Sequence, residues 1–221
     1  MYKGLETIRK GNTAQCVADI FEIHFPTAKT VLDCTAGAMR FWKWDHDLEI
    51  TGIDIDPPID DSRITVADYR NIPFETASFD VMTFDPPFLF SRGIQAVNGS
   101  KRFFMGAEAG NYESRRWSKE QITMPKNPAE LLQQYRRIFE QRHIAKQGLI
   151  CKGQNLVTGA NRDYWSYNVM KLAEEVGMGL PTDILIQHSP AHRMADPRWK
   201  VQRKFRTAEC YYLIYHHAKK T

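Results

Sequence analysis

Short β-rich runs alternate with longer helical stretches along this chain, and this alternation constrains the fold more than any other feature. The runs expected to form strands cover residues 30–35, 49–56, 63–68, 79–85, 148–153, 180–189 and 208–218. Helices are expected over residues 13–25, just after residue 37, over 128–146 and over 162–176. Such alternation predicts an α/β fold, with a mostly parallel sheet and helices on both faces. No helix separates the last two runs, so we expect them to pair antiparallel as the end of a seven-stranded sheet.

Length and composition fit a single domain spanning residues 1–221. A chain of this length buries one substantial core, and its 43% hydrophobic and 25% charged residues are typical of a globular protein rather than a disordered one. The four cysteines are far apart and lack metal-ligand spacing, so we expect buried thiols in a reducing compartment and no metal site. Neither a signal-peptide core nor a membrane-length apolar run is apparent, which favours a cytoplasmic protein without a membrane partner.

Two basic stretches, at about residues 89–127 and 190–207, interrupt the alternation as insertions. The first has seven Lys or Arg against three Glu with aromatic residues interleaved, and the second has six Lys or Arg against Asp196 alone. Loops of this length in a compact domain are usually functional or disordered. Basic side chains can follow phosphates while an aromatic ring stacks on a base. We therefore expect nucleic-acid contacts from Arg193, Trp199, Arg203 and Lys204, with a solvated loop as the alternative.

Aspartates close three of the expected strands, at the edge where open α/β sheets bind ligands. Asp33 precedes a tight turn at Gly37, where a ligand can approach the backbone and the free N–H groups that follow. Asp54 is placed to accept both hydroxyls of a ribose, and Asp68 to accept an adenine amino group. Each alone could equally be a turn former or a cap. Together their charges would repel one another, and a cationic ligand with hydroxyl and amino donors would offset that repulsion.

The most specific motif is Asp85-Pro86-Pro87-Phe88. Its two prolines stiffen the chain just past a buried strand. The Asp85 carboxylate and the Pro86 carbonyl can then accept both hydrogens of an aromatic amine, which turns the nitrogen lone pair toward a methyl donor. Phe88 offers a flat face on which a base can stack. The alternative is a rigid turn with a core phenylalanine.

These motifs resemble those of class I S-adenosylmethionine-dependent methyltransferases that methylate amino groups. The chain is similar to that family in its motif I, ribose site, adenine site and catalytic tetrapeptide, at VLDCTAG (31–37), GIDID (52–56), VADYR (66–70) and DPPF (85–88). Met39 stands where motif I often has a second glycine. The resemblance covers about residues 10–89 and 128–220 and implies a Rossmann-like fold. It implies cofactor contacts from Asp33, Thr35, Ala36, Gly37, Asp54, Ile55, Asp68 and Tyr69, and a catalytic role for Asp85, Pro86, Pro87 and Phe88.

The resemblance implies S-adenosylmethionine as cofactor and a DNA-methylating enzyme that acts on adenine N6, with cytosine N4 as a close variant. Three alternatives stay open: an RNA methyltransferase acting on adenine N6 or guanine N2, a non-catalytic nucleic-acid-binding subunit of the same fold, and a small-molecule N-methyltransferase. Lys152, after the fifth expected strand, is expected either to contact substrate or to be solvated. The sequence leaves open whether an accessory subunit or an oligomer is needed.

Overall fold

The structure is a computed structural model that describes residues 5–57, 59–86, 125, 127–158, 161–188 and 209–217. Nearly all of the two basic insertions lies outside these residues. Six of the expected site residues also lie outside them: Pro87, Phe88, Arg193, Trp199, Arg203 and Lys204.

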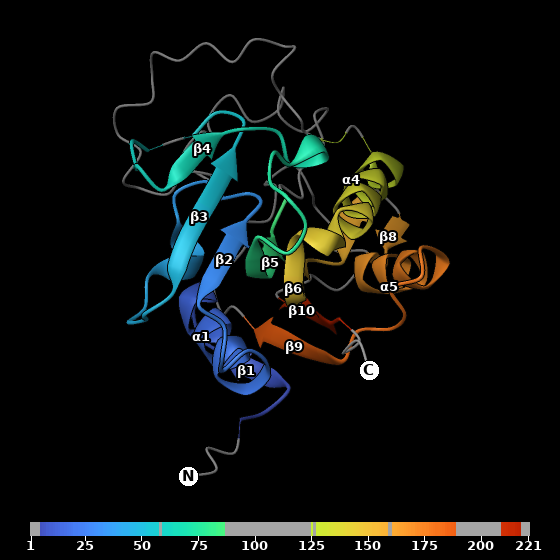
Figure 1. Ribbon diagram of the computed structural model, residues 1–221. Helices are drawn as coiled ribbons and strands as arrows, with labels where there is room; N and C mark the ends of the chain where they lie inside the picture. Colours follow the sequence, from blue (N-terminus) through green and yellow to red (C-terminus); the bar gives the residue numbers. More distant parts are fainter. Residues whose placement is uncertain are drawn as a thin grey trace.

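Eight strands form one sheet in the order β1-β9-β10-β6-β5-β2-β3-β4 (Figure 1). They are β1 (Ile8–Lys10), β2 (Thr30–Asp33), β3 (Glu49–Asp54), β4 (Ile64–Val66), β5 (Phe79–Phe84), β6 (Ala145–Gly153), β9 (Asp183–His188) and β10 (Glu209–His216). Strand β10 runs antiparallel to β6 and β9, and the other neighbouring pairs of this sheet are parallel. The Rossmann-like, mostly parallel sheet with a terminal antiparallel pair is thereby confirmed. A hairpin of β7 (Leu156–Thr158) and β8 (Asn161–Asp163) follows β6.

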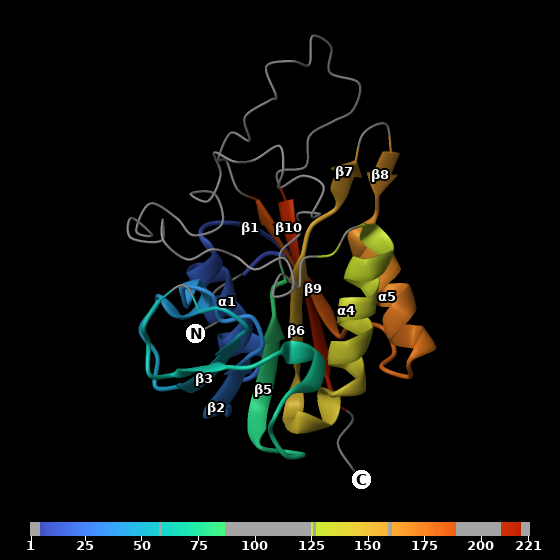
Figure 2. The same cartoon turned by 90° about the horizontal axis from the view of Figure 1, so that it is seen from above.

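Helices cover both faces of the central strands, and the apolar residues of these strands pack against them. Helix α1 (Thr13–His24) packs on one face, and α4 (Pro128–Glu140) with α5 (Trp165–Glu175) packs on the other (Figure 2). Val81, Met82 and Phe84 of β5 are fully buried, as expected of a parallel strand between two helical layers. None of the helices in the described segments has the length and apolar character of a membrane span.

The expected starts of the first helix and of the helix that begins at Pro128 are confirmed by their caps. The Asn12 side chain accepts the Gln15 N–H and the Gln15 side chain accepts the Asn12 N–H, which forms a capping box at the start of α1. Asn127 caps α4, whose first residue is Pro128.

Three expectations differ from the structure. The helix expected after Gly37 is only a 3₁₀ turn, η1 (Arg40–Trp42), because Met39 has a left-handed φ of 55° that an α-helix cannot contain. The helix expected over 128–146 ends at Glu140, since a second 3₁₀ turn, η4 (Arg142–Ile144), leads directly into β6. There Ala145 pairs with Phe79, so strand pairing overrides the helical pattern. The eighth strand, β1, is short and largely exposed, and its sequence carries no strand pattern.

Candidate active site

Four neighbouring strands deliver their carboxyl ends to one edge of the sheet. Asp33 lies opposite Gly52 of β3 and Thr83 of β5, and Phe84 lies opposite Cys151 of β6. The residues that continue these strands at the same edge are Asp54, Asp85 and Lys152. The register thus gathers three carboxylates and one ammonium group in the place where open α/β sheets bind ligands.

The turn after β2 is held to the neighbouring strand β3 by its own backbone. Gly37 adopts a left-handed φ of 47°, and its N–H donates to Asp54 Oδ2 at 3.0 Å. The Ala36 N–H donates to the Ile53 carbonyl at 3.1 Å. Gly52 makes this close approach feasible, because a Cβ there would lie 2.6 Å from the Ala36 Cβ. A second, less obvious glycine therefore shapes the turn.

Asp33 organises the turn from beneath. One carboxylate oxygen accepts the Thr35 N–H at 3.1 Å, and the other accepts the Trp42 indole N–H at 2.8 Å. The side chain is only 3% exposed, and this burial raises the pKa of Asp33 to about 6. Among the described residues, no cationic side chain bonds to the Asp33 carboxylate. A cationic ligand would therefore stabilise its buried negative charge.

The raised pKa of Asp33 predicts a pH-dependent stability. Between its ordinary pKa of 3.8 and its folded value of about 6, the folded chain binds a proton that the unfolded chain does not. Stability therefore falls as pH rises across this interval. An Asp33→Asn variant has no such group, so the unfolding free energy of wild type minus that of the variant is expected to drop by roughly 1–3 kcal/mol between pH 4 and 7. Denaturant unfolding of both proteins measures this difference, and a value that is constant with pH would contradict a raised pKa for the buried Asp33.

Asp54 lies at the end of β3 with its carboxylate turned to the backbone around it. Oδ1 accepts the Asp56 N–H at 2.9 Å, while Oδ2 accepts the Gly37 N–H. Burial raises the pKa of Asp54, and the backbone donors, including Ile55, oppose that rise. A carboxylate can accept about four hydrogen bonds and these backbone donors use three, so Asp54 keeps acceptor capacity for a ligand hydroxyl.

Asp68 and Tyr69, which were also expected to contact the cofactor, make contacts within the protein. Asp68 follows β4 and caps the 3₁₀ turn η2 (Tyr69–Asn71), and its carboxylate accepts hydrogen bonds from the Arg70 N–H, Nε and Nη2. Partial burial opposes them, but these bonds lower the pKa of Asp68 overall. Tyr69 is buried, with its ring 5.1 Å from that of Phe84. In this structure Asp68 is thus paired with Arg70, and Tyr69 contributes to the core.

Asp85 connects the acidic edge to the proline motif. Its N–H donates to Thr35 Oγ1 at 2.9 Å, so the glycine turn and the end of β5 are joined by one hydrogen bond. Asp85 Oδ2 accepts from Lys152 Nζ, also at 2.9 Å. Pro86 follows and is buried. The hydrogen bond to Thr35 therefore fixes the backbone at Asp85, the first residue of the proline motif.

Lys152 is a strand residue of β6 rather than a turn residue, and it is not solvated. The residue is 9% exposed, and Nζ lies 5.3 Å from the centre of the Phe41 ring and 5.8 Å from that of Tyr212. Phe41 and Tyr212, together with Trp42, are site residues that sequence reasoning missed. No local signal marks them, because η1 and β10 bring them to this edge only through tertiary folding.

The chain matches no family model and no curated protein. Solved structures that resemble it include the following three. A Burkholderia thailandensis 1,6-didemethyltoxoflavin-N1-methyltransferase, solved with that compound and S-adenosylhomocysteine, is 11% identical over 92% of this chain and 77% of its own, with a TM-score of 0.48. A proposed rRNA-methylase from Clostridium thermocellum is 13% identical over 94% and 98%, with a TM-score of 0.41. A Methanosarcina mazei S-adenosylmethionine-dependent methyltransferase is 11% identical over 89% and 96%, with a TM-score of 0.45. Similarity at this level transfers no substrate, so the site geometry must carry the functional assignment.

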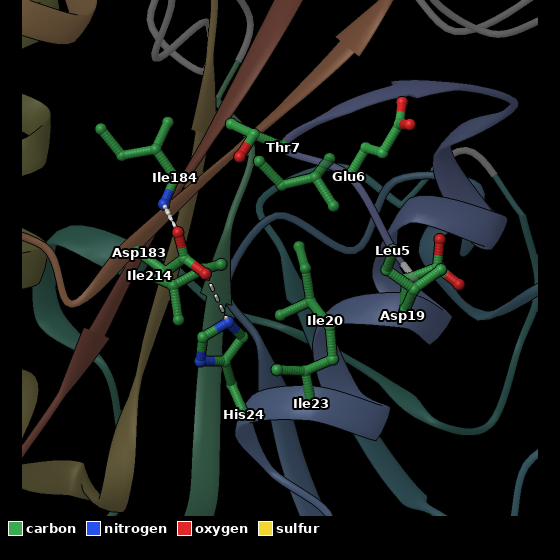
Figure 3. A pocket seen from close by; sticks show the side chains of 11 residues that line it. Leu5, Glu6, Thr7, Asp19, Ile20, Ile23, His24, Asp183, Ile184 and Ile214 are labelled. Atoms are coloured by element: carbon green, nitrogen blue, oxygen red, sulfur yellow. Dashed lines mark hydrogen bonds and ion pairs between the residues drawn. The ribbon is translucent and has the colours of Figure 1, made fainter. Parts of the chain in front are cut away.

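A separate small hollow of about 80 Å³ lies between α1 and strands β9 and β10 (Figure 3). His24 Nε2 reaches Asp183 Oδ2 there at 3.2 Å, and Ile20, Ile184 and Ile214 supply apolar walls. Asp183 opens β9 and Ile214 lies near the end of β10, so the hollow belongs to the opposite edge of the sheet from Asp85. In the described segments, no group of three or more potential metal ligands gathers there or elsewhere.

Proposed function

We propose that this chain is an S-adenosylmethionine-dependent methyltransferase that acts on an exocyclic amino nitrogen of a nucleobase. The observation that carries the proposal is the hydrogen bond from the Asp85 N–H to Thr35 Oγ1 at 2.9 Å. It joins the turn suited to the methyl donor to the residue suited to the acceptor amine. The two reactants would then be held by adjacent parts of one rigid edge, which is the main requirement of a transfer driven by proximity.

The residues of this edge fit the chemistry of the cofactor. The left-handed Gly37 presents no side chain toward a ligand, and Asp54 retains acceptor capacity for ribose hydroxyls. The buried carboxylate of Asp33 and the partly buried carboxylate of Asp54 have raised pKa values, so a positively charged ligand would relieve the cost of their ionisation. These features favour a ligand that approaches the backbone at Gly37, donates hydroxyl hydrogens to Asp54 and carries a positive charge. A sulfonium compound with an amino group and ribose hydroxyls is such a ligand.

When bound, S-adenosylmethionine supplies a methyl group already activated on a sulfonium sulfur. The protein's own part is to bind, orient and stabilise. Asp85 and the Pro86 carbonyl accept the two N–H groups of the amine, which fixes the direction of its lone pair. The same acceptors stabilise the positive charge that develops on nitrogen as the new bond forms. No side chain needs to form a covalent bond with the substrate.

A nucleic acid is the proposed source of the amine, with adenine N6 in DNA as the leading target and cytosine N4 as its variant. The formal net charge of +4 and the two basic, aromatic-containing insertions support a polyanionic partner. A base within a duplex would have to leave the stack to reach Asp85. An RNA target, a small-molecule amine and a non-catalytic binding subunit are the other outcomes that the following test distinguishes.

The test is to supply tritiated S-adenosylmethionine with DNA and with RNA in separate reactions, followed by nucleoside analysis of labelled product. The expected result is label in N6-methyladenine or N4-methylcytosine from DNA. Label in RNA nucleosides would move the proposal to an RNA enzyme. If the chain binds the cofactor but labels neither polymer, the proposal of a nucleobase substrate is wrong. If the chain does not bind the cofactor, the assignment as an enzyme is wrong.

A further inference from the structure

We propose that Lys152 is a positioning residue, which holds Asp85 as a carboxylate in one orientation and leaves Oδ1 for the acceptor amine. The inference rests on the proposed function and deepens it, because it defines which class of amine the site accepts. The observation behind it is a partly buried ion pair: Lys152 Nζ donates to Asp85 Oδ2 at 2.9 Å, with the two side chains 11% and 24% exposed. No hydrogen bond to Oδ1 is formed by the described residues.

The backbone of Lys152 is held by a neighbouring strand and by a helix before its side chain makes any contact. The residue lies in β6 between β5 and β10, directly opposite Tyr212 in the register. Its carbonyl accepts the Tyr135 hydroxyl at 2.8 Å, a bond that ties β6 to α4. The strand therefore delivers the lysine side chain from a position that cannot shift without breaking the sheet.

Two aromatic rings restrict the ammonium group further. Nζ lies within 6 Å of the ring centres of Phe41 and Tyr212, a cation–π distance. The Tyr212 ring is itself held, since its hydroxyl donates to Gln187 Oε1 at 2.7 Å. The ammonium thus has an anion as one neighbour and two ring faces as others, so its hydrogen bond with Asp85 has one favoured geometry.

The charge state of Lys152 rules out a role as a base. Burial alone would lower its pKa, but the Asp85 carboxylate beside it raises the pKa above the ordinary value. The lysine is therefore an ammonium at neutral pH, and it makes the Asp85 pair neutral as a unit. An amine that is already protonated would bring a full positive charge beside the lysine before transfer begins, and it has no lone pair to attack the methyl group. An uncharged aromatic amine keeps its lone pair, and Oδ1 and the Pro86 carbonyl then need to stabilise only the charge that develops during transfer, so we infer that the acceptor is of that class.

Other titratable groups surround this pair and must be separated from it in any pH experiment. They are Asp33 of β2, Tyr135 of α4, Cys16 of α1, and Tyr212 and Cys210 of β10. Burial raises the pKa of Cys16 to about 11 and those of both tyrosines well above their ordinary values, so these three stay uncharged. Asp33, with a pKa of about 6, is the group whose titration has to be assigned separately.

The variants that test the proposal are Lys152→Met and Lys152→Arg. The chain also supplies a matched control at the far end of the same two strands, where Lys146 Nζ contacts Asp80 Oδ1 at 3.3 Å. Lys146→Met breaks a lysine–aspartate pair between β5 and β6 without reaching the site. Purified full-length proteins are compared, with Asp85→Asn and Asp33→Asn used to assign the two carboxyl signals.

The first readout is independent of turnover: the titration of ¹³C-labelled aspartate carboxyls followed by NMR. In Lys152→Met the Asp85 midpoint is expected to rise by about one pH unit or more, because a neighbouring cation no longer favours the charged form. It should stay near the wild-type value in Lys152→Arg and in Lys146→Met. In reverse, Asp85→Asn should lower the Lys152 midpoint in lysine-labelled protein, which provides the measurement if Lys152→Met fails to fold.

The second readout is the pH profile of methyl transfer. In Lys152→Met, kcat is expected to fall about ten- to a hundredfold, with its acid limb moved to higher pH and with cofactor affinity unchanged. Unchanged midpoints for Asp85 in Lys152→Met and for Lys152 in Asp85→Asn would overturn the proposal. Full transfer by Asp85→Ala would instead overturn the proposed function, while the NMR titration would still report on the pair.

Discussion

Asp85→Ala is expected to reduce the rate of methyl transfer by about a hundred- to a thousandfold while cofactor affinity stays within about twofold of wild type. The reason is the placement of the side chain. The Asp85 carboxylate bonds to Lys152 rather than to the glycine turn, and only the Asp85 N–H, which alanine keeps, bonds to Thr35. Single-turnover transfer and calorimetric titration of S-adenosylhomocysteine measure the two quantities separately.

A matched control lies at the start of the same strand. Asp80 accepts the N–H groups of Lys29 and Thr30 and contacts Lys146, far from the site edge. Asp80→Ala is expected to lower stability and leave the rate per folded molecule unchanged. Full turnover by Asp85→Ala, or an equal loss in both variants, would remove Asp85 from the chemistry.

Asp54→Ala is expected to weaken S-adenosylhomocysteine binding by about ten- to a hundredfold, which corresponds to roughly 1.4–2.7 kcal/mol. Two losses contribute. The ribose would lose its carboxylate acceptor, and the Gly37 N–H would lose the bond at 3.0 Å that fixes the turn. Calorimetry on the purified variant provides the dissociation constant, and transfer at saturating cofactor should recover most of the wild-type rate.

Two comparisons isolate this effect. Asp54→Asn keeps an acceptor toward Gly37 and should lie between wild type and the alanine variant. Asp61→Ala removes an aspartate that pairs with the exposed Arg63 ahead of β4, and it should bind as wild type does. If Asp54→Ala binds the cofactor with wild-type affinity, the ribose assignment is wrong.

Much of the sheet is predictable because its information is local. The runs around Val31, Ile53 and Val81 are apolar on both faces, and each is followed by Asp, Gly or Pro at the sheet edge. The carboxyl ends of parallel strands meet by geometry alone. Asp33, Asp54 and Asp85 could therefore be placed at one edge from the sequence.

The site contacts that could not be predicted from the sequence join segments that are distant along the chain. The Lys152 ammonium meets Asp85 of the adjacent strand, Phe41 of a 3₁₀ turn and Tyr212 of the last described strand. Met39 in a left-handed conformation replaces an expected helix by a turn, and that turn brings Trp42 onto Asp33. Neither pairing follows from residue spacing, because each requires the sheet to be assembled first.

The most direct test of the site is a crystal structure of the chain with S-adenosylhomocysteine. We expect the ribose hydroxyls on Asp54, the adenosine beside the Gly37 turn, and the sulfur facing Asp85 and Pro86 across a gap that admits a planar ring. S-adenosylhomocysteine bound in the hollow beside His24, or with its sulfur turned away from Asp85, would contradict the proposed transfer.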